Sequence, residues 1–305
     1  MIIRFIKNWA LPIAMILGTI GYQFFYRFFP LIPYLLFAML FLTFCKVSFR
    51  DLRFEPLHFW LLLIQVVGSV LSFVVLYPFS KYLAETAMLC FIAPTAAAAA
   101  VVTGKLGGSV PCLTMYTLLS CLMTAILVPL FFPYIAALPP HIDLQVDRSF
   151  IMSVLLIMRR IFPIIVLPLV LAWLIREFLP RLHTKLSSIS GVSFYLWAIS
   201  LTCVTAITVK SLVDSKSNTA IEWLSALVGL VICCIQFILG KTIGQHFGQR
   251  ISGGQGLGQK NTSLVIWISQ LYLNPISSLG PCSYVIWQNI INSWQLWKKR
   301  KSDIK

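Results

Sequence analysis

Apolar runs, each about long enough to cross a lipid bilayer, follow one another along almost the whole sequence. A transmembrane helix needs about 20 mainly apolar residues, and this chain of 305 residues is 59% apolar and only 11% charged. So few charged side chains do not cover a soluble domain of this size. The sequence therefore predicts an all-α polytopic membrane protein. We expect about ten spans, near residues 9-27, 31-46, 57-79, 83-104, 109-136, 161-180, 191-209, 219-243, 261-275 and 278-297.

The lysines and arginines between these runs are distributed unevenly over the two sides of the membrane. With the N-terminus inside, sixteen of the 24 lie on the inner side and seven on the outer side, and Lys260 is left over in the segment at membrane depth, directly before the span near 261-275. This positive-inside bias predicts a plasma membrane protein with both termini in the cytoplasm. The net charge of +15 is then a signal of topology and of contact with membrane lipid, and we expect no nucleic-acid partner.

A polar segment at residues 137-148 divides the predicted spans five and five. Because each half has an odd number of spans, the second half enters from the opposite side, so structural repeats would be inverted repeats. We expect a first five-helix repeat at 1-140, an outer loop and interfacial helix at 141-160, a second repeat at 161-297 and a basic cytoplasmic tail at 298-305.

One predicted span in each half is interrupted by helix-breaking residues. Pro94 lies inside an apolar run and is followed by the small residues Ala96 to Ala100, while Gly256 and Gly258 precede a lysine in the second half. Unwound backbone at membrane depth is tolerated where it lines a cavity or is covered by protein, and such pairs of segments mark transporter binding sites. The alternative for the alanines is a tightly packed helix without a ligand, which we favour for those residues.

Lys260 is the basic residue that the hydropathy pattern places at membrane depth. A charged side chain there costs several kcal/mol unless a cavity, carbonyl groups or an anion receives it. The alternative is that Lys260 lies near the interface and extends its ammonium to water. We favour the site, because polar residues accompany the lysine. The predicted substrate- or ion-binding residues are Lys260, Gln259, Asn261, Thr262, Thr95, Thr103, Gln65 and Thr117, with the helices broken at Pro94, Gly256 and Gly258.

Enzymatic chemistry is not favoured by the sequence. None of the nine acidic residues falls in the middle of a predicted span, which argues against an intramembrane aspartyl protease and against a carboxylate proton relay. The four histidines lie at span edges or in loops, so no serine or cysteine nucleophile has an evident base. The eight cysteines have no metal-ligand spacing. We expect no catalytic residues, no cofactor and no metal.

Two motifs resemble those of the bile acid:sodium symporter family. Ala93-Pro94-Thr95-Ala96 followed by Gly104-Lys105-Leu106-Gly107-Gly108 is similar to the fourth-helix signature, and Gly258-Gln259-Lys260-Asn261-Thr262-Ser263-Leu264 is similar to the ninth-helix signature. The resemblance implies a ten-helix fold of two inverted five-helix repeats. It also implies that the two discontinuous helices cross at the membrane centre, between a core domain and a panel domain.

This chain departs from the sodium-using members of that family at the positions that bind sodium. Ala99 and Ala100 stand where those members have serine and asparagine, Gly256 stands for a glutamate, and Lys260 stands for a glutamine. Gln65 is similar to a third-helix ligand. The resemblance therefore points to a divergent, sodium-ligand-poor branch.

The sequence predicts a secondary active transporter of an organic anion, a carboxylate or a sterol-like anion, that works without sodium. Lys260 would occupy the vacated ion site, either as a fixed charge or as an amine that gives proton coupling. The alternative is a membrane sensor or accessory subunit that kept the fold and lost transport. Neither the substrate nor the oligomeric state follows from the sequence.

Overall fold

The computed structural model describes residues 2–47, 52–137, 150–189, 192–214 and 219–303. These residues are almost entirely helical, and no strand longer than a single bridge occurs among them. Six helical segments are long and apolar enough to cross a membrane, which indicates an integral membrane protein: Tyr22–Phe44, Pro56–Leu76, Val110–Ala136, Phe150–Phe178, Val192–Asp214 and Thr219–His246.

The chain divides into two compact units, each built from both halves of the sequence. Unit 1 contains residues 1–47 and 159–217, and unit 2 contains residues 48–158 and 218–305. Each half thus contributes its first two predicted spans to unit 1 and its last three to unit 2.

Unit 1 is organised around the helix α10. Helices α1, α2 and α3 and the 3₁₀ helix η1 all pack against it. The contact with α1 is close: a side chain at Gly18 would lie 2.6 Å from the carbonyl oxygen of Thr202. The bounds in this unit are α1 Ile2–Ile20, α2 Tyr22–Phe25, η1 Tyr26–Leu31, α3 Ile32–Phe44, α9 Pro180–Ser188 and α10 Val192–Asp214, together with the end of α8, Phe150–Phe178.

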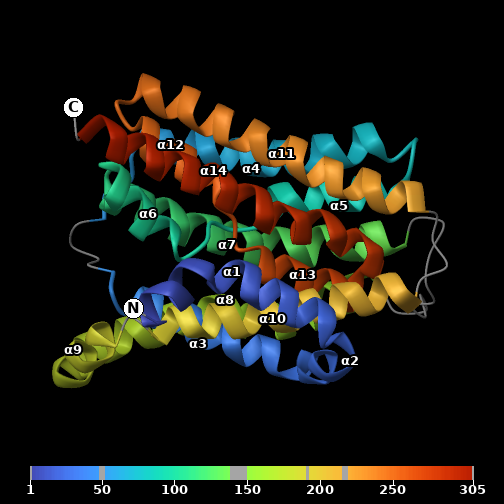
Figure 1. The fold of residues 1–305 in the computed structure, drawn as a ribbon, viewed down its shortest axis with the longest axis horizontal. Helices are drawn as coiled ribbons and strands as arrows, with labels where there is room; N and C mark the ends of the chain where they lie inside the picture. Colours follow the sequence, from blue (N-terminus) through green and yellow to red (C-terminus); the bar gives the residue numbers. More distant parts are fainter. Residues whose placement is uncertain (1, 48–51, 138–149, 190–191, 215–218, 304–305) are drawn as a thin grey trace. The chain divides into compact units, whose positions relative to one another are not determined.

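Unit 2 contains two interrupted helices among longer ones. The first interrupted helix consists of α5 and α6, and the second consists of α12 and α13. In Figure 1, the two halves of each interrupted helix extend toward opposite ends of the unit. Helix α11 packs against α4, α5, α12 and α14, and α7 packs against α4, α6 and α12. The bounds are α4 Pro56–Leu76, α5 Lys81–Ile92, α6 Ala99–Leu106, α7 Val110–Ala136, α11 Thr219–His246, α12 Arg250–Gly258, α13 Thr262–Tyr272, η3 Pro275–Ser278 and α14 Leu279–Asp303.

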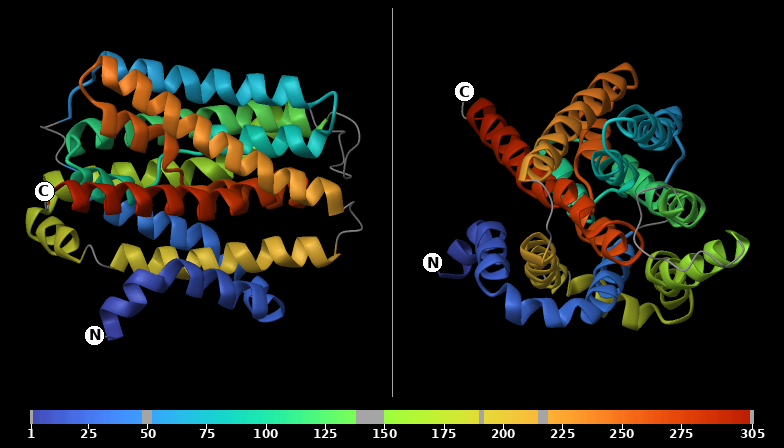
Figure 2. Two further views of the ribbon diagram at one scale, coloured as in Figure 1. Left: turned by 45° about the horizontal axis from the view of Figure 1, so that its top comes forward. Right: turned by 90° about the vertical axis from the view of Figure 1, so that its right-hand side faces the viewer.

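The basic residues of unit 2 gather at one end, which we call the basic end. The start of α4, the end of α6, the start of α12 and the end of α14 all lie there (Figures 1 and 2). The hydrogen bond from the Ser109 amide to the Ser252 hydroxyl, at 3.0 Å, joins the start of α7 to the first turn of α12. Its basic residues in the described part of the chain are Arg53, Lys105, Lys241, Arg250, Lys298, Lys299, Arg300 and Lys301. At the opposite end, the described part of unit 2 has Lys81.

The structure adds detail at two expected boundaries. Residues 150-160 do not form a separate interfacial helix but the first part of α8, which runs through Pro163 and Pro168. Proline is tolerated inside membrane helices because neighbouring groups satisfy the freed carbonyls. The expected tail from residue 298 is a continuation of α14 as far as Asp303. The expected outer loop around Pro139 and Pro140 lies outside the described residues.

Candidate functional site

The two interrupted helices meet at their breaks. Thr95 in the first break and Lys260 in the second form an isolated antiparallel bridge. The Ala96 amide donates to the Gln259 carbonyl oxygen at 2.8 Å, and the Asn261 amide donates to the carbonyl of the proline in the first break at 2.7 Å. Because the bridge is made by backbone groups, it satisfies donors and acceptors that broken helices would otherwise leave unpaired. This contact between two distant segments was predicted from one breaker in each half.

Pro94 explains why α5 ends where it does. Proline has no amide hydrogen, so the carbonyl of Cys90 loses its donor within the helix. The side chain of Gln236 on α11 replaces that donor at 3.0 Å. The next carbonyl, that of Phe91, accepts from the Nζ of Lys260 at 3.2 Å. Side chains from two other elements therefore take over the hydrogen bonds that helix continuation would have made.

The last carbonyl of α5 and the amide after the proline are satisfied from α4 and α7. The Ile92 carbonyl accepts from Gln65 Nε2 at 3.1 Å and from the Thr124 hydroxyl at 2.8 Å. The Thr95 amide donates to the Ser120 hydroxyl at 3.2 Å. Ser120 in turn donates to Gln65 Oε1 at 2.9 Å. The first break is thus held by a connected network of buried polar groups.

The second break lies one residue beyond the glycines that the sequence suggested. Gly256 and Gly258 are the last turn of α12, and the break is at residues 259-261. These glycines are instead required by close packing: Gly256 faces the Tyr116 ring of α7, where a side chain would lie 2.7 Å away, while Gly253 and Gly258 face α11. A side chain at Gly253 would lie 2.3 Å from the Gly240 carbonyl oxygen, and one at Gly258 would lie 2.4 Å from the Phe237 ring. Glycines allow neighbouring helices to pack closely, and this packing compensates for the low helix propensity of glycine.

The freed carbonyls of α12 are also satisfied by side chains. The Thr95 hydroxyl donates to the Gly256 carbonyl at 2.8 Å, and the Tyr284 hydroxyl donates to the Gly258 carbonyl at 2.8 Å. The amide side chain of Gln288 on α14 pairs with both backbone groups of Lys260, accepting at 2.7 Å and donating at 3.2 Å. Helix α14 therefore fixes the backbone of the second break.

Lys260 is buried, with an exposed fraction of 1%. Its ammonium does not extend to water, which excludes the interfacial alternative. It lies instead at the C-terminal end of α5, where the helix dipole carries partial negative charge and favours a cation. When it is protonated, the lysine of one interrupted helix therefore lies where it offsets the partial negative charge at the end of the other. This arrangement stabilises the crossing itself.

The structure brings together five of the eight residues predicted to bind a substrate or ion: Thr95, Gln65, Gln259, Lys260 and Asn261. A sixth, Thr262, begins α13 directly after the break. The other two do not contact the breaks through their hydroxyls. Thr117 donates to the Leu113 carbonyl of its own helix at 3.0 Å, and the buried hydroxyl of Thr103 in α6 has no hydrogen-bond partner among the described residues.

Sequence reasoning missed several residues of this network. Ser120, Thr124 and Tyr284 contact the breaks directly. A signal for two of them was present, because Tyr116, Ser120 and Thr124 recur every four residues and therefore share one face of α7. Nothing comparable marks Tyr284. The polar side chains of Gln236 on α11 and Gln288 on α14 also make hydrogen bonds between helices at the breaks.

No protein-family model matches this chain, and no curated protein sequence matches it. The similarity to the bile acid:sodium symporter family therefore depends on the two short motifs and on the predicted layout of spans.

Proposed function

We propose that this protein is a secondary active transporter of a small organic anion, with a fold similar to that of the bile acid:sodium symporters. The observation that carries the proposal is the paired crossing of two interrupted helices around the buried Lys260. Half-helices that end at membrane depth expose the partially charged amide and carbonyl groups of their ends, and a solute can bind to these groups. Substrate sites in carriers with repeated halves usually lie at such ends.

The division of the chain supports ten spans in two inverted repeats. Six helical segments are individually long enough to cross, and α1, the two interrupted helices and α14 would complete the ten. Corresponding spans of the two halves belong to the same unit, as expected if the halves are structural repeats. The basic end of unit 2 would face the cytoplasm under the positive-inside rule, with the C-terminus on that side.

The four helix ends at the crossing differ in whether side chains bind their free backbone groups, and this difference favours an anionic cargo. The C-terminal carbonyls of α5 and α12 accept hydrogen bonds from the side chains described above. The N-terminal ends of α6 and α13 have no side-chain cap. Helix N-termini carry partial positive charge and bind anions such as carboxylates. Ala98 at the start of α6 is exposed, so this end is accessible to a solute.

Sodium independence follows from the ligands at the crossing. Ala99 and Ala100 carry no side-chain oxygen, the Gly256 carbonyl accepts from Thr95, and the Phe91 carbonyl accepts from Lys260. A hard cation needs several oxygen ligands to replace its water. The Lys260 ammonium would take the role of such an ion without dissociating.

Counterflow in proteoliposomes against a panel of labelled organic carboxylates and sterol-like anions tests the proposal. We expect saturable exchange of at least one class, with equal rates in sodium and choline buffers of the same ionic strength. Steep dependence on sodium would contradict the assignment of Lys260. A folded protein that exchanges no anion in the panel would contradict transport and favour the sensor or accessory subunit.

A further inference from the structure

The exposed face of α14 changes from apolar to basic as the helix approaches the basic end. Ile286 and Ile290 are exposed apolar residues, and Trp294 and Trp297 follow them at the four- and three-residue spacings that keep side chains on one helix face. The exposed fractions of the two tryptophans are 54% and 55%. Tryptophan is typical of the level at which the hydrocarbon of a membrane meets its headgroups. This face of α14 therefore passes from hydrocarbon to headgroups at Trp294 and Trp297.

Each of these two tryptophans has a lysine over its ring. Nζ of Lys298 lies 5.5 Å from the centre of the Trp294 ring, and Nζ of Lys301 lies 5.3 Å from the centre of the Trp297 ring. A cation in this position is attracted by the negative face of the ring. The indoles therefore hold two ammonium groups at the level of the headgroups. Lys298 is exposed, so its ammonium is accessible to an anion.

Two cations from other helices lie close to Lys298. Lys241, near the end of α11, is half-buried and is acted on electrostatically by both Arg250 at the start of α12 and Lys298. Close packing of α11 on α12 fixes this place: a side chain at Gly254 would lie 2.5 Å from Cγ of Lys241, and one at Gly244 would lie 3.2 Å from Cα of Arg250. Three helices, whose ends lie together at the basic end in Figures 1 and 2, thus contribute one positive charge each. We call Lys241, Arg250 and Lys298 the cation cluster.

The described part of the chain supplies no carboxylate to the cation cluster. No ion pair between described residues includes any of its three members. The acids of the basic end that the structure describes have other partners, because Asp303 lies 2.7 Å from Nζ of Lys299 and Glu55 accepts from the Cys112 thiol at 3.5 Å. Like charges repel one another, and an anion placed between them replaces repulsion by attraction. The cation cluster is therefore suited to an anion that does not belong to the described chain.

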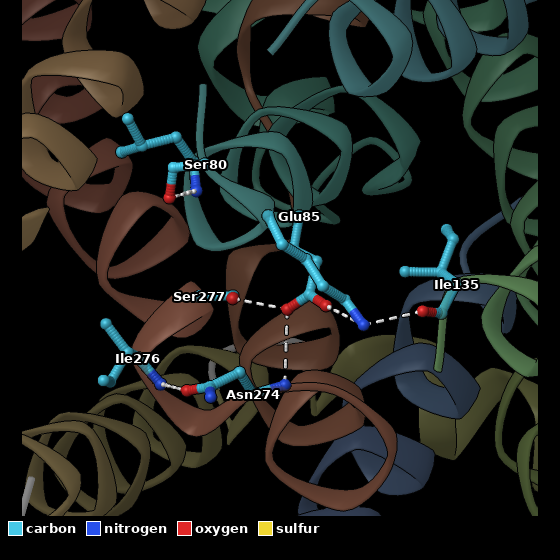
Figure 3. A network of polar contacts seen from close by, with 8 residues as sticks. Ser80, Glu85, Ile135, Asn274, Ile276 and Ser277 are labelled. Atoms are coloured by element: carbon cyan, nitrogen blue, oxygen red, sulfur yellow. Dashed lines mark hydrogen bonds and ion pairs between the residues drawn. The ribbon is translucent and has the colours of Figure 1, made fainter. Parts of the chain in front are cut away.

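A lysine at the opposite end of unit 2 shows the contrasting arrangement. Nζ of Lys81 lies 3.5 Å from Oε1 of the buried Glu85 and donates to the Ile135 carbonyl at 2.8 Å. Figure 3 shows that the same carboxylate accepts from the Ser277 hydroxyl, at 2.6 Å. At that end the chain provides the anion itself. At the basic end the anion has to come from the surroundings.

We propose that the cation cluster binds the phosphate of an anionic phospholipid, whose acyl chains lie along the face of α14 that carries Ile290 and Trp294. Arg250 offers a planar fork of donors that matches phosphate oxygens, and the two lysines add compact positive charges. Lys298 connects the two parts of the site, because it acts on Lys241 and lies over Trp294. The lipid comes from the leaflet at the basic end. This site goes beyond the proposed transport function, and binding to it does not require transport.

Native mass spectrometry of the full chain in detergent measures lipid binding directly. The probes are phosphatidylglycerol, which carries a net negative charge, and phosphatidylcholine, which has the same phosphate and acyl chains with a compensating choline. We expect phosphatidylglycerol to bind with a dissociation constant about tenfold below that of phosphatidylcholine. Equimolar inorganic phosphate at constant ionic strength should not displace it, because phosphate lacks the acyl chains that contact α14.

Two triple variants with the same change of charge separate the cation cluster from general attraction to a basic surface. The cluster variant replaces all three members by glutamine and should bind the two lipids equally. The control variant should keep the preference of the parent, and it removes three exposed charges elsewhere at the basic end by Arg53→Gln, Lys105→Gln and Arg300→Gln. If the cluster variant does not elute as a folded protein, Arg250→Gln decides. This exposed substitution alone should weaken the binding of phosphatidylglycerol about fivefold.

Fluorescence quenching by phosphatidylglycerol with brominated acyl chains tests where the lipid lies. In vesicles that also contain unlabelled phosphatidylcholine, tryptophan quenching should be stronger in the parent than in the cluster variant. This difference should disappear when Trp294→Phe is added to both proteins. Trp223→Phe is the matched control, because Trp223 is an exposed tryptophan near the other end of unit 2, in the first turns of α11. It should leave the difference unchanged.

Equal affinity of the parent for the two lipids, or equal loss of the preference in the cluster and control variants, would overturn the proposal. Displacement by equimolar inorganic phosphate would show a site for a free anion and would also overturn it. A quenching difference that survives Trp294→Phe would contradict the place of the acyl chains. Because all of these measurements are made without cargo, the lipid site and the transport function can fail independently.

Discussion

The ammonium of Lys260 donates a hydrogen bond to the carbonyl of Phe91, so the break in one interrupted helix carries the cation that neutralises the end of the other. The two residues are 169 positions apart, and the contact exists only because the backbones of both breaks pair at the same point. A mobile ion bound between the same helix ends could dissociate. The lysine is covalently attached to the chain, so its amino group stays at the crossing.

Replacing Lys260 should separate a fixed charge from a releasable proton. Lys260→Gln removes the charge at the end of α5, whose interaction with the helix dipole amounts to up to about 2 kcal/mol. We expect anion exchange to fall about tenfold and sodium not to restore it. Lys260→Arg keeps a cation that does not release its proton, and should retain the pH dependence of the parent. Loss of pH dependence in Lys260→Arg, measured by counterflow, would show that this lysine carries the proton.

The pairing of Gln288 with both backbone groups of Lys260 should be a major contribution to stability. Gln288→Ala leaves a buried amide and a buried carbonyl unsatisfied, which costs about 1–3 kcal/mol for each group. We expect a fall of several degrees in the melting temperature in detergent. Asn289→Ala is the matched control, because the Asn289 side chain donates to Val285 of its own helix. Equal melting temperatures for the two variants would argue against the role of Gln288.

The hydroxyl of Thr95 should matter more than that of Thr117. Thr95→Val preserves shape but removes the donor to the Gly256 carbonyl, so one buried acceptor is left unpaired. Thr117→Val removes a bond within α7, where the Leu113 carbonyl belongs to an intact helix. Thermal unfolding should show a loss of about 1–3 kcal/mol for Thr95→Val and a smaller loss for Thr117→Val. The reverse order would mean that the crossing is not held by the Thr95 hydroxyl.

Close packing of α11 on α12 should make Gly240 intolerant of a side chain. A Cβ at Gly240 would lie 2.3 Å from the Gly253 carbonyl oxygen, which is backbone and cannot rotate away. We expect Gly240→Ala to destabilise the protein by about 1–3 kcal/mol or more and to lower its yield in membranes. Gly104→Ala meets only a Val110 methyl group at 3.2 Å and should be tolerated. A stable Gly240→Ala protein would show that the helices are farther apart.

The distribution of basic residues predicts which ends face the cytoplasm. On a background without native cysteines, a cysteine at Ser302 should be protected from a membrane-impermeant maleimide in intact cells, and one at His141 should react. Permeabilised cells provide the control, because both positions should then react. Labelling of residue 302 in intact cells would invert the topology.

The sequence by itself determined the membrane class, the positions of most helices and the two interruptions. Hydrophobic length and the absent amide of Pro94 are local properties, so they act in the same way whatever surrounds them. The sequence also identified Lys260 as a residue whose burial costs free energy, since an unpaired charge at membrane depth is unfavourable in any fold.

Only the tertiary structure decided how those costs are offset. Whether the helix unwinds at Gly256 and Gly258 depends on α7 and α11, because Tyr116 of α7 packs against Gly256 and Phe237 of α11 packs against Gly258. Whether Lys260 reaches water or a carbonyl depends on where α5 ends in space. The burial of Glu85 could not be predicted from the residues next to it in the sequence. Glu85 is covered by η3, whose Ser277 is 192 positions away. Contacts of that separation are set by packing, which the local pattern of a sequence does not encode.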